Sequence, residues 1–266
     1  MEKVTSQDGT SIAYYRSGTG MPLVLVPGTG GSNPAVGWTA VVPALEKHFS
    51  IYSVDRRGRG ESGDGSTYAI EREIEDIAAV VDSIGEPVNL LGHSFGGICA
   101  LEAGLLTRNI RKLVLYEPSI SVPGVPIDYA EGLTDRLQAL LDVGDREGVL
   151  TTFYNQVAGM SPHEIEQLSS SPAWSARLAI THTLLREMQA EERYNFDAQR
   201  FRDLHPPTLL LLGGDSSKYF KEAIEVLRAA LPNSRIAIMP GQQHIAMYTA
   251  PDLFVSELVQ FLLEPL

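Results

Sequence analysis

The stretch Asn89-Leu90-Leu91-Gly92-His93-Ser94-Phe95-Gly96-Gly97 lies where an apolar run changes into a run with helical character. The apolar residues before Gly92 predict a buried strand, and the residues after Ser94 predict a helix. Between them, Gly92 to Gly96 has the pattern G-x-S-x-G, in which glycine is needed because side chains would collide in a sharp strand-to-helix turn. The stretch is therefore either a simple turn or a turn that exposes a nucleophile, and its context favours the nucleophile.

Outward from this turn, strand-like and helix-like segments alternate. The apolar strands are short and continuous, which is typical of a sheet covered by helices on both faces. The sequence thus predicts an α/β fold with a doubly wound, mostly parallel sheet. The predicted strands are 11–17, 22–27, 49–55, 87–91, 112–116, 207–212 and 235–239, and the predicted helices are 36–48, 70–84, 95–106, 218–231 and 251–263.

The alternation stops after Glu117-Pro118. From about residue 121 to 201 no convincing strand is present, only helical stretches with plausible starts at Pro126, Gly144, Ser161-Pro162 and Ser171-Pro172. We therefore expect one core domain, residues 1–120 and 202–266, with an all-helical cap inserted at 121–201.

Composition excludes several classes of function. A net charge of -12 without a basic cluster argues against nucleic acid and against an anionic membrane surface as partners. The single cysteine, Cys99, cannot form an internal disulfide, and the histidines lack zinc-site spacing, so no metal is expected. The polar N-terminal residues and the lack of a long apolar run predict a soluble, cytoplasmic monomer or homodimer.

A serine needs a base to become a nucleophile, and two later strand ends carry suitable groups. Leu209 to Leu212 is followed by Gly213-Gly214-Asp215, and Met239 is followed by a loop that carries His244. Both side chains should emerge at the carboxyl edge of the sheet beside Ser94, where ligands bind in open α/β sheets. We therefore expect Ser94, His244 and Asp215 to act together.

Over essentially its whole length the chain resembles the α/β-hydrolase fold family. The resemblance is carried by residues 26–31, 55–62, the turn at 92–96, Gly214-Asp215 and residues 241–244. It implies a catalytic triad of Ser94, Asp215 and His244, with the backbone NH groups of Thr29 and Phe95 as the oxyanion hole. The chain departs from the family in having Pro27-Gly28 where histidine-glycine is usual, which leaves the backbone donors in place.

Glu117 is the alternative acid, because it also follows a strand at the catalytic edge and some relatives place their acid there. We favour Asp215. A glycine pattern at 58–63 resembles a dinucleotide site, but no helix is expected directly after it, which argues against nucleotide binding.

The resemblance implies a serine hydrolase that cleaves a carboxylic ester or lactone through an acyl-enzyme and needs no cofactor. We expect a small hydrophobic substrate in an apolar pocket lined by Gly28, Trp174, Ile245 and Met247. The alternatives are a cofactor-free haloperoxidase or perhydrolase and a receptor-like protein that binds a ligand with little turnover.

Overall fold

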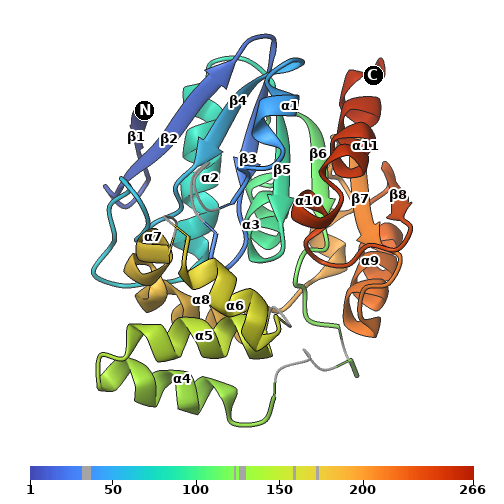
Figure 1. Cartoon of the computed structure of the whole chain (residues 1–266). Coiled ribbons are helices and arrows are strands. Elements are labelled where there is room, and N and C mark those ends of the chain that lie inside the picture. The colour runs from blue at the N-terminus through green and yellow to red at the C-terminus, as the bar shows by residue number, and fades with distance from the viewer. Residues whose placement is uncertain (32–36, 123, 126–129, 158–159, 172–173) are drawn as a thin grey trace.

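The computed structural model describes residues 1–31, 37–122, 124–125, 130–157, 160–171 and 174–266. These residues contain an eight-stranded sheet in the order β1-β2-β4-β3-β5-β6-β7-β8 (Figure 1). The pairs β1-β2 and β2-β4 are antiparallel, and all the other pairs are parallel. The strands are β1 Glu2–Thr5, β2 Ser11–Gly18, β3 Met21–Val26, β4 Phe49–Val54, β5 Val88–His93, β6 Ile110–Tyr116, β7 Thr208–Gly213 and β8 Ser234–Met239.

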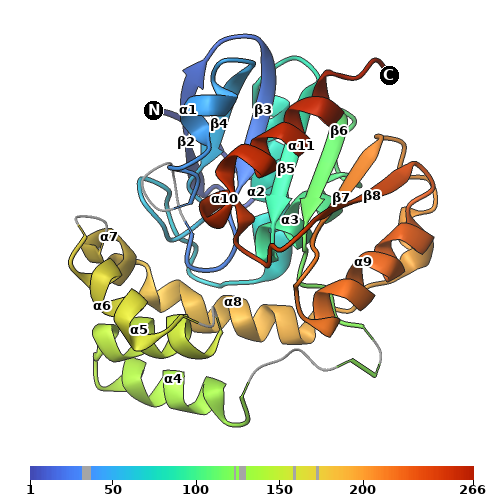
Figure 2. The same cartoon turned by 45° about the vertical axis from the view of Figure 1, so that its right-hand side comes forward.

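Helices cover both faces of the sheet, because successive side chains of a strand point to opposite faces. Val24 and Val26 of β3 belong to one apolar cluster, with α2 (Ile70–Ser83), α3 (Phe95–Ala103) and α9 (Lys218–Ala230). Leu23 and Leu25 belong to the other, with α1 (Val42–Leu45), α10 (Ala246–Thr249) and α11 (Pro251–Leu263). Figure 2 shows α10 and α11 in front of the strands and α2 and α3 behind them. The sheet is therefore the middle layer of three, as the continuous apolar strands predict.

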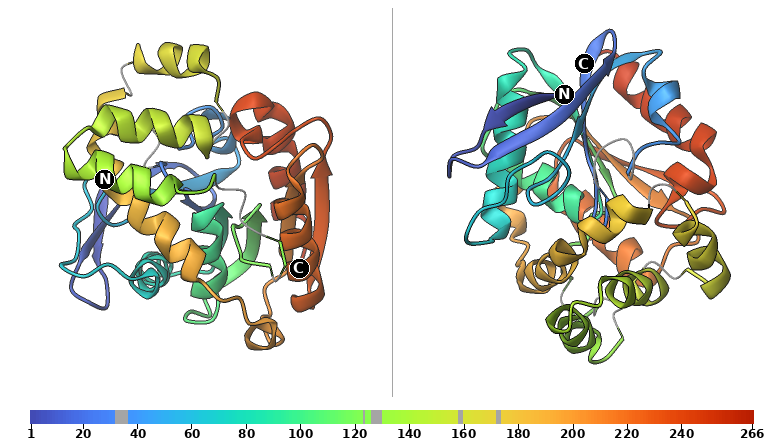
Figure 3. Two further views of the ribbon diagram at one scale, coloured as in Figure 1. Left: turned by 90° about the horizontal axis from the view of Figure 1, so that it is seen from below. Right: turned by 60° about the vertical axis from the view of Figure 1, so that its left-hand side comes forward.

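Between β6 and β7, the described residues form the helices α4 to α8, which make a separate group at one end of the sheet (Figure 3). They bury an apolar cluster of their own, to which Leu137, Leu150, Leu184 and Met188 contribute. This group lies within the segment predicted as a cap and is called the cap below. Its helices are α4 Leu133–Asp142, α5 Arg146–Gln156, α6 Pro162–Ser169, α7 Trp174–Ala179 and α8 Thr181–Arg193.

The boundary predicted for the cap at residue 201 is too late. Tyr194 and Phe201 pack into the apolar cluster of the sheet, and Phe201 ends a short 3-10 helix, Ala198–Phe201. The chain therefore returns to the core layer directly after α8. Composition did not indicate this, because a short 3-10 segment resembles the end of a cap helix.

The prediction of an α/β fold with a mostly parallel sheet is confirmed, with differences in single elements. The helix predicted at 36–48 is reduced to Val42–Leu45, because residues 38–41 form turns that bury Trp38. The strand β1 was missed, since it is only four residues long and mostly exposed. The predicted helix start at Ser161-Pro162 is confirmed by α6, whereas Pro126 and Pro172 lie outside the described residues.

No helix in the described ranges is both long and apolar enough to cross a membrane.

Candidate active site

The parallel strands β3, β5, β6, β7 and β8 all end at the edge of the sheet that faces the cap (Figure 1). The residues that follow these strands therefore lie together, although they are far apart in the sequence. Gly28, Ser94, Glu117, Asp215 and His244 each come directly after one of these strand ends or from the loop beyond it.

Ser94 occupies a strained backbone turn between β5 and α3. Its φ of 55° and ψ of -127° are unusual for a residue with a side chain, and such strain is concentrated at functional sites. A Cβ at Gly92 would lie 2.5 Å from the carbonyl oxygen of Gly96, and one at Gly96 would lie 2.4 Å from that of Pro27. Only glycine fits at these two positions, as the sequence pattern predicts.

Glu117 is the acid that contacts the histidine. Its Oε2 lies 2.7 Å from Nδ1 of His244, and its Oε1 accepts hydrogen bonds from the backbone NH of Gly213 at 2.7 Å and the hydroxyl of Ser216 at 2.5 Å. A carboxylate oxygen can only accept, so Nδ1 of His244 carries the proton and Nε2 is left as the basic nitrogen. Glu117 is fully buried and also has a positive φ, 42°.

The predicted pairing of Asp215 with His244 is wrong. Asp215 is exposed, and its side chain forms no hydrogen bond to any group in the described part of the chain. Its backbone NH instead donates to the carbonyl of Gln242 at 2.9 Å, which ties the β7 turn to the histidine loop. The turn after β7 thus supports the acid through Gly213 and Ser216, while the carboxylate itself comes from β6.

The backbone around Ser94 offers two unused amide donors. Neither the NH of Thr29 nor that of Phe95 donates to another described group. Phe95 is the first residue of α3, where NH groups have no partner within the helix and the helix dipole favours negative charge. Gly28 lies directly against the serine, since a Cβ there would be 2.8 Å from Cβ of Ser94. The two amides predicted as oxyanion donors therefore belong to segments that adjoin Ser94.

Ser94 and His244 open onto a cavity of about 150 Å³ between the sheet edge and the cap. Three residues predicted for the pocket, Gly28, Ile245 and Met247, line it, and so does Thr29. The prediction that Trp174 lines the pocket is wrong, because Trp174 is buried inside the cap and packs against Tyr154. The wall is also not purely apolar. Residues that sequence analysis missed line it too, namely Trp38, Phe153, Tyr154, Val157, Arg177, Glu191 and Tyr248.

Aromatic groups hold the histidine loop in place. The ring of Phe220 stacks on His244 with centroids 4.2 Å apart. The hydroxyl of Tyr116 donates to the carbonyl of Gln243 and accepts from the NH of Ala246, so it bridges the two sides of His244. Nε2 of His93 lies 2.9 Å from the carbonyl oxygen of His244, and the His93 ring stacks on Tyr116. Burial, and then the neighbouring His244, hold the pKa of His93 far below its ordinary value.

A buried cluster of charged side chains lies behind the loop of residues 27–31. This arginine cluster consists of Arg56, Arg57, Arg59, Glu73, Asp76 and Glu187. Arg56 and Arg59 both pair with Glu187 of the cap helix α8, and Arg56 also pairs with Glu73 of α2. Nη1 of Arg56 also donates to the carbonyl of Pro27, and Nη1 of Arg59 donates to the carbonyls of Gly28 and Gly31. The cluster therefore fixes the loop that carries the Thr29 amide and connects it to the cap.

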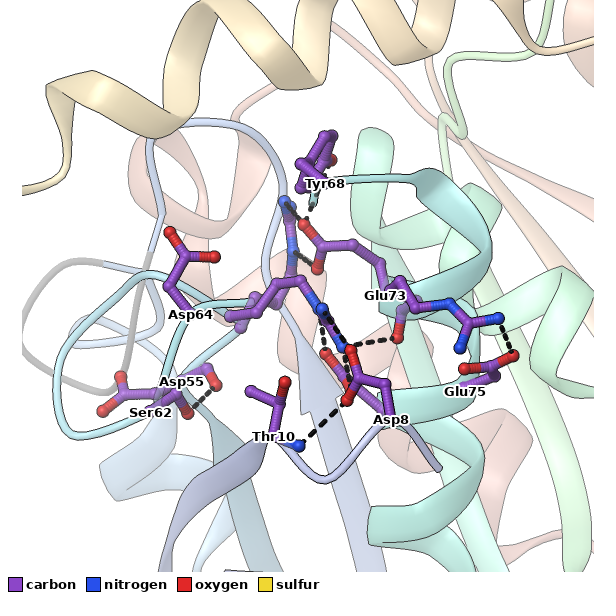
Figure 4. Close-up of polar contacts among 12 residues, drawn as sticks. Asp8, Thr10, Asp55, Ser62, Asp64, Tyr68, Glu73 and Glu75 are labelled. Carbon is purple, nitrogen blue, oxygen red and sulfur yellow. Dashed lines mark hydrogen bonds and ion pairs between the residues drawn. The ribbon is translucent and has the colours of Figure 1, made fainter. Parts of the chain in front are cut away.

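Arg57 extends the arginine cluster toward the β1-β2 turn. It binds Asp76 at 2.7 Å and Asp8 at 2.9 Å, and Figure 4 shows Asp8 and Glu73 directed at the same group of guanidinium side chains. The glycine pattern at 58–63 belongs to this structure, since a Cβ at Gly60 would overlap the carboxylate of Asp55 at 2.0 Å. The next helix, α2, begins only at Ile70. The glycines of this loop thus serve local packing.

Within the described ranges, no three His, Cys, Asp or Glu side chains come together in a way that could hold a metal ion.

Comparison with known proteins identifies the family that shares this fold. The model of the alpha/beta hydrolase family matches residues 23–257. A protein of Agrobacterium fabrum named "Putative carbamate hydrolase RutD" is 27% identical over 249 residues, which cover 91% of this chain and 92% of that protein.

Two solved structures extend the comparison. The crystal structure of an alpha/beta hydrolase from Sphaerobacter thermophilus is 34% identical, with a TM-score of 0.82 over 98% of this chain and 100% of the other. The esterase RhEst1 from Rhodococcus is 26% identical, with a TM-score of 0.77 over 98% and 97%. On the extent of the family match, the strand-to-helix turn and the shared fold, this chain belongs to the alpha/beta hydrolase family.

Proposed function

We propose that this hydrolase is a serine enzyme that cleaves a carboxylic ester or lactone of small size through an acyl-enzyme. One observation carries the proposal: a serine on a strained turn shares a cavity with a histidine whose Nδ1 is held by a fully buried carboxylate. A serine alone is a weak nucleophile, and this arrangement supplies the base and the group that orients it.

In the proposed reaction, Nε2 of His244 takes the proton of Ser94 as the hydroxyl oxygen attacks the carbonyl carbon. The NH groups of Thr29 and Phe95 stabilise the negative oxygen that forms, and each lowers the activation free energy by about 3 kcal/mol. The protonated His244 then donates its proton to the leaving alcohol. Water attacks the acyl-enzyme by the reverse proton path, and Ser94 is regenerated.

Glu117 takes the role expected of Asp215. It keeps the proton of His244 on Nδ1 and stabilises the imidazolium in both steps. Because Glu117 also accepts from Gly213 and Ser216, its orientation is fixed before substrate binds.

A second candidate reaction is cleavage of a C–N bond next to a carbonyl. The relative from Agrobacterium is named for a carbamate, and the same serine, histidine and amide donors suit a carbamate carbonyl. The identity of the leaving group is the difference between the two proposals. The perhydrolase alternative uses the same acyl-enzyme with hydrogen peroxide as the acceptor.

The test is a panel of 4-nitrophenyl esters, lactones and carbamates, together with labelling by a fluorophosphonate probe. We expect labelling of Ser94, turnover of small esters and loss of both in the Ser94→Ala variant. Turnover of carbamates but not of esters would favour the second candidate, and peroxide-dependent acyl transfer would favour the perhydrolase. Absence of labelling and of turnover would contradict the proposal and indicate a ligand-binding protein.

A further inference from the structure

The cavity beside Ser94 contains a cation that the proposed reaction does not use. Arg177 lies on α7, in the cap, and its side chain lines the cavity together with Ser94 and His244. A cavity of about 150 Å³ is smaller than the roughly 300 to 1,000 Å³ typical of sites for drug-sized ligands, so a small substrate would lie close to both Ser94 and Arg177.

Among the described residues, no carboxylate is paired with Arg177. Its Nη1 donates to the hydroxyl of Tyr154 at 2.6 Å, and its guanidinium carbon lies 5.7 Å from the centre of that ring. No carboxylate of the described residues lies within 4.0 Å of it, and its buried Nε donates to no group there. The three arginines of the arginine cluster, by contrast, are each paired with a carboxylate. The charge on Arg177 is therefore available at the cavity wall.

Two tyrosines hold the Arg177 side chain in position. Tyr154 belongs to α5, and Tyr248 follows the histidine loop and donates to the carbonyl of Gly37 at 2.8 Å. Tyr248 lines the same cavity as Arg177. Burial raises the pKa of Tyr248, and the positive charge of Arg177 opposes this change. An arginine fixed in this way loses little conformational freedom when it binds a ligand.

One carboxylate, that of Glu191 on α8, also lines the cavity. The described side chains of Glu191 and Arg177 form no ion pair with each other, and burial and then the charge of Glu191 raise the pKa of Tyr219 on α9. Arg177 donates instead to the hydroxyl of Tyr154. An anionic group would be attracted to the Arg177 end of the cavity.

We propose that Arg177 forms a subsite for a carboxylate. The substrate is then an ester or amide that carries a free carboxylate group besides its reactive carbonyl group. The inference rests on the proposed function in that Ser94 attacks the reactive carbonyl of the same molecule. A guanidinium presents parallel donors that match the two oxygens of a carboxylate, and the partly enclosed cavity strengthens their attraction. The subsite would select short dicarboxylic monoesters or monoamides over neutral substrates.

The experiment compares two esters with acyl chains of equal length: 4-nitrophenyl monoglutarate, which is anionic, and 4-nitrophenyl pentanoate, which is neutral. In Arg177→Gln, the ratio of kcat/KM for the anionic ester to that for the neutral ester should fall about 10- to 150-fold, the usual range for a hydrogen bond to a charged group. Arg177→Lys should retain part of the preference. Arg146→Gln removes the same charge from an exposed position on the cap and should leave the ratio unchanged.

An equal loss of activity toward both esters in Arg177→Gln would overturn the inference while leaving the proposed function intact. If the wild-type protein hydrolyses neither ester, the proposed function fails, and calorimetric binding of glutarate tests the subsite separately. Binding of glutarate to the wild type that is lost in Arg177→Gln supports the subsite. Absent binding, or equal binding to both, contradicts it.

Discussion

The loop of residues 27–31 borders two polar regions that differ in how their polar groups are satisfied. On the cavity side, buried polar atoms have no partner within the described structure: Oγ1 of Thr29, Nε1 of Trp38 and Nε of Arg177. In the arginine cluster, each guanidinium is paired with a carboxylate, and the remaining donors bind loop carbonyls, apart from Nε of Arg59.

This difference distinguishes a region that can bind a ligand from a region that stabilises the fold. A buried polar group without a partner costs free energy unless a ligand supplies one, so the three groups of this kind that line the cavity are available to a ligand. A fully paired charge has little left to offer a ligand, but its removal leaves its partner uncompensated. We therefore expect changes at the cavity to reduce activity and changes in the arginine cluster to reduce stability.

The largest effect is expected at Ser94. Ser94→Ala should lower kcat on small esters by about 10⁵- to 10⁶-fold, because the acyl-enzyme cannot form. Its unfolding free energy should change little. The matched control is Ser119→Ala, which removes a buried hydroxyl without a partner from the turn after β6. Near-normal turnover in Ser94→Ala would contradict the role of Ser94 as the nucleophile of this cavity.

Glu117 comes next. Glu117→Gln should lower kcat about 10⁴-fold, since an amide no longer favours the productive tautomer of His244. Steady-state kinetics of Glu117→Gln, Glu117→Asp and Asp215→Asn would test this expectation. Asp215→Asn should keep kcat within about twofold, because the exposed Asp215 side chain has no described partner. If Asp215→Asn loses turnover while Glu117→Gln retains it, the structural assignment is wrong.

Asp215 was predicted as the partner of His244, whereas the structure places Glu117 there, and this difference has a physical cause. Asp215 and Glu117 both follow strands that end at the same edge, so the sequence placed either one near His244. The choice depends on the turn after β6, where Glu117 adopts a positive φ and points beneath the histidine. A residue with a side chain in this conformation has no reliable sequence signature, because the surrounding hydrogen bonds impose it.

The sheet and the nucleophilic turn were predictable, since both depend on local patterns. Continuous apolar strands indicated the buried sheet, and Gly92 and Gly96 are required by contacts below 3 Å that no side chain could make. The cavity wall was not predictable in the same way. Arg177 and Tyr154 reach it only because cap helices distant in sequence fold over the sheet edge. The sequence shows an arginine on a helix, but not which face the fold will enclose.

A change at Glu187 tests whether the arginine cluster stabilises the fold. Burial raises the pKa of Glu187, but the positive charges of Arg56 and Arg59 outweigh burial and hold the pKa below its ordinary value. Glu187→Gln leaves two buried guanidinium groups short of a negative charge and should lower the unfolding free energy by about 3 to 5 kcal/mol. Urea unfolding measures this. Glu71→Gln, an exposed change on α2, should cost less than about 0.5 kcal/mol. Equal costs in the two variants would remove the distinction between the two regions.

The smallest effect is expected at Asp76, where the contribution of the carboxyl group to the unfolding free energy depends on pH. Burial raises its pKa from 3.8 to about 6 and outweighs the opposing hydrogen bond from Arg57. A carboxyl with a raised pKa in the folded state binds protons more tightly there than when unfolded. Its contribution to stability is therefore fully present below about pH 4 and is lost as the pH rises through 6.

The shift of about two units limits this contribution to roughly 3 kcal/mol. Between pH 4.5 and 7, the stability of the wild type relative to Asp76→Asn should therefore decrease as the pH rises. Asp8 binds the same arginine, but the Arg57 hydrogen bond lowers its pKa, so its contribution is lost only at more acidic pH. The exposed change Asp203→Asn should show no such dependence. A constant difference between wild type and Asp76→Asn would mean that the ion pair with Arg57, and not burial, dominates at this position.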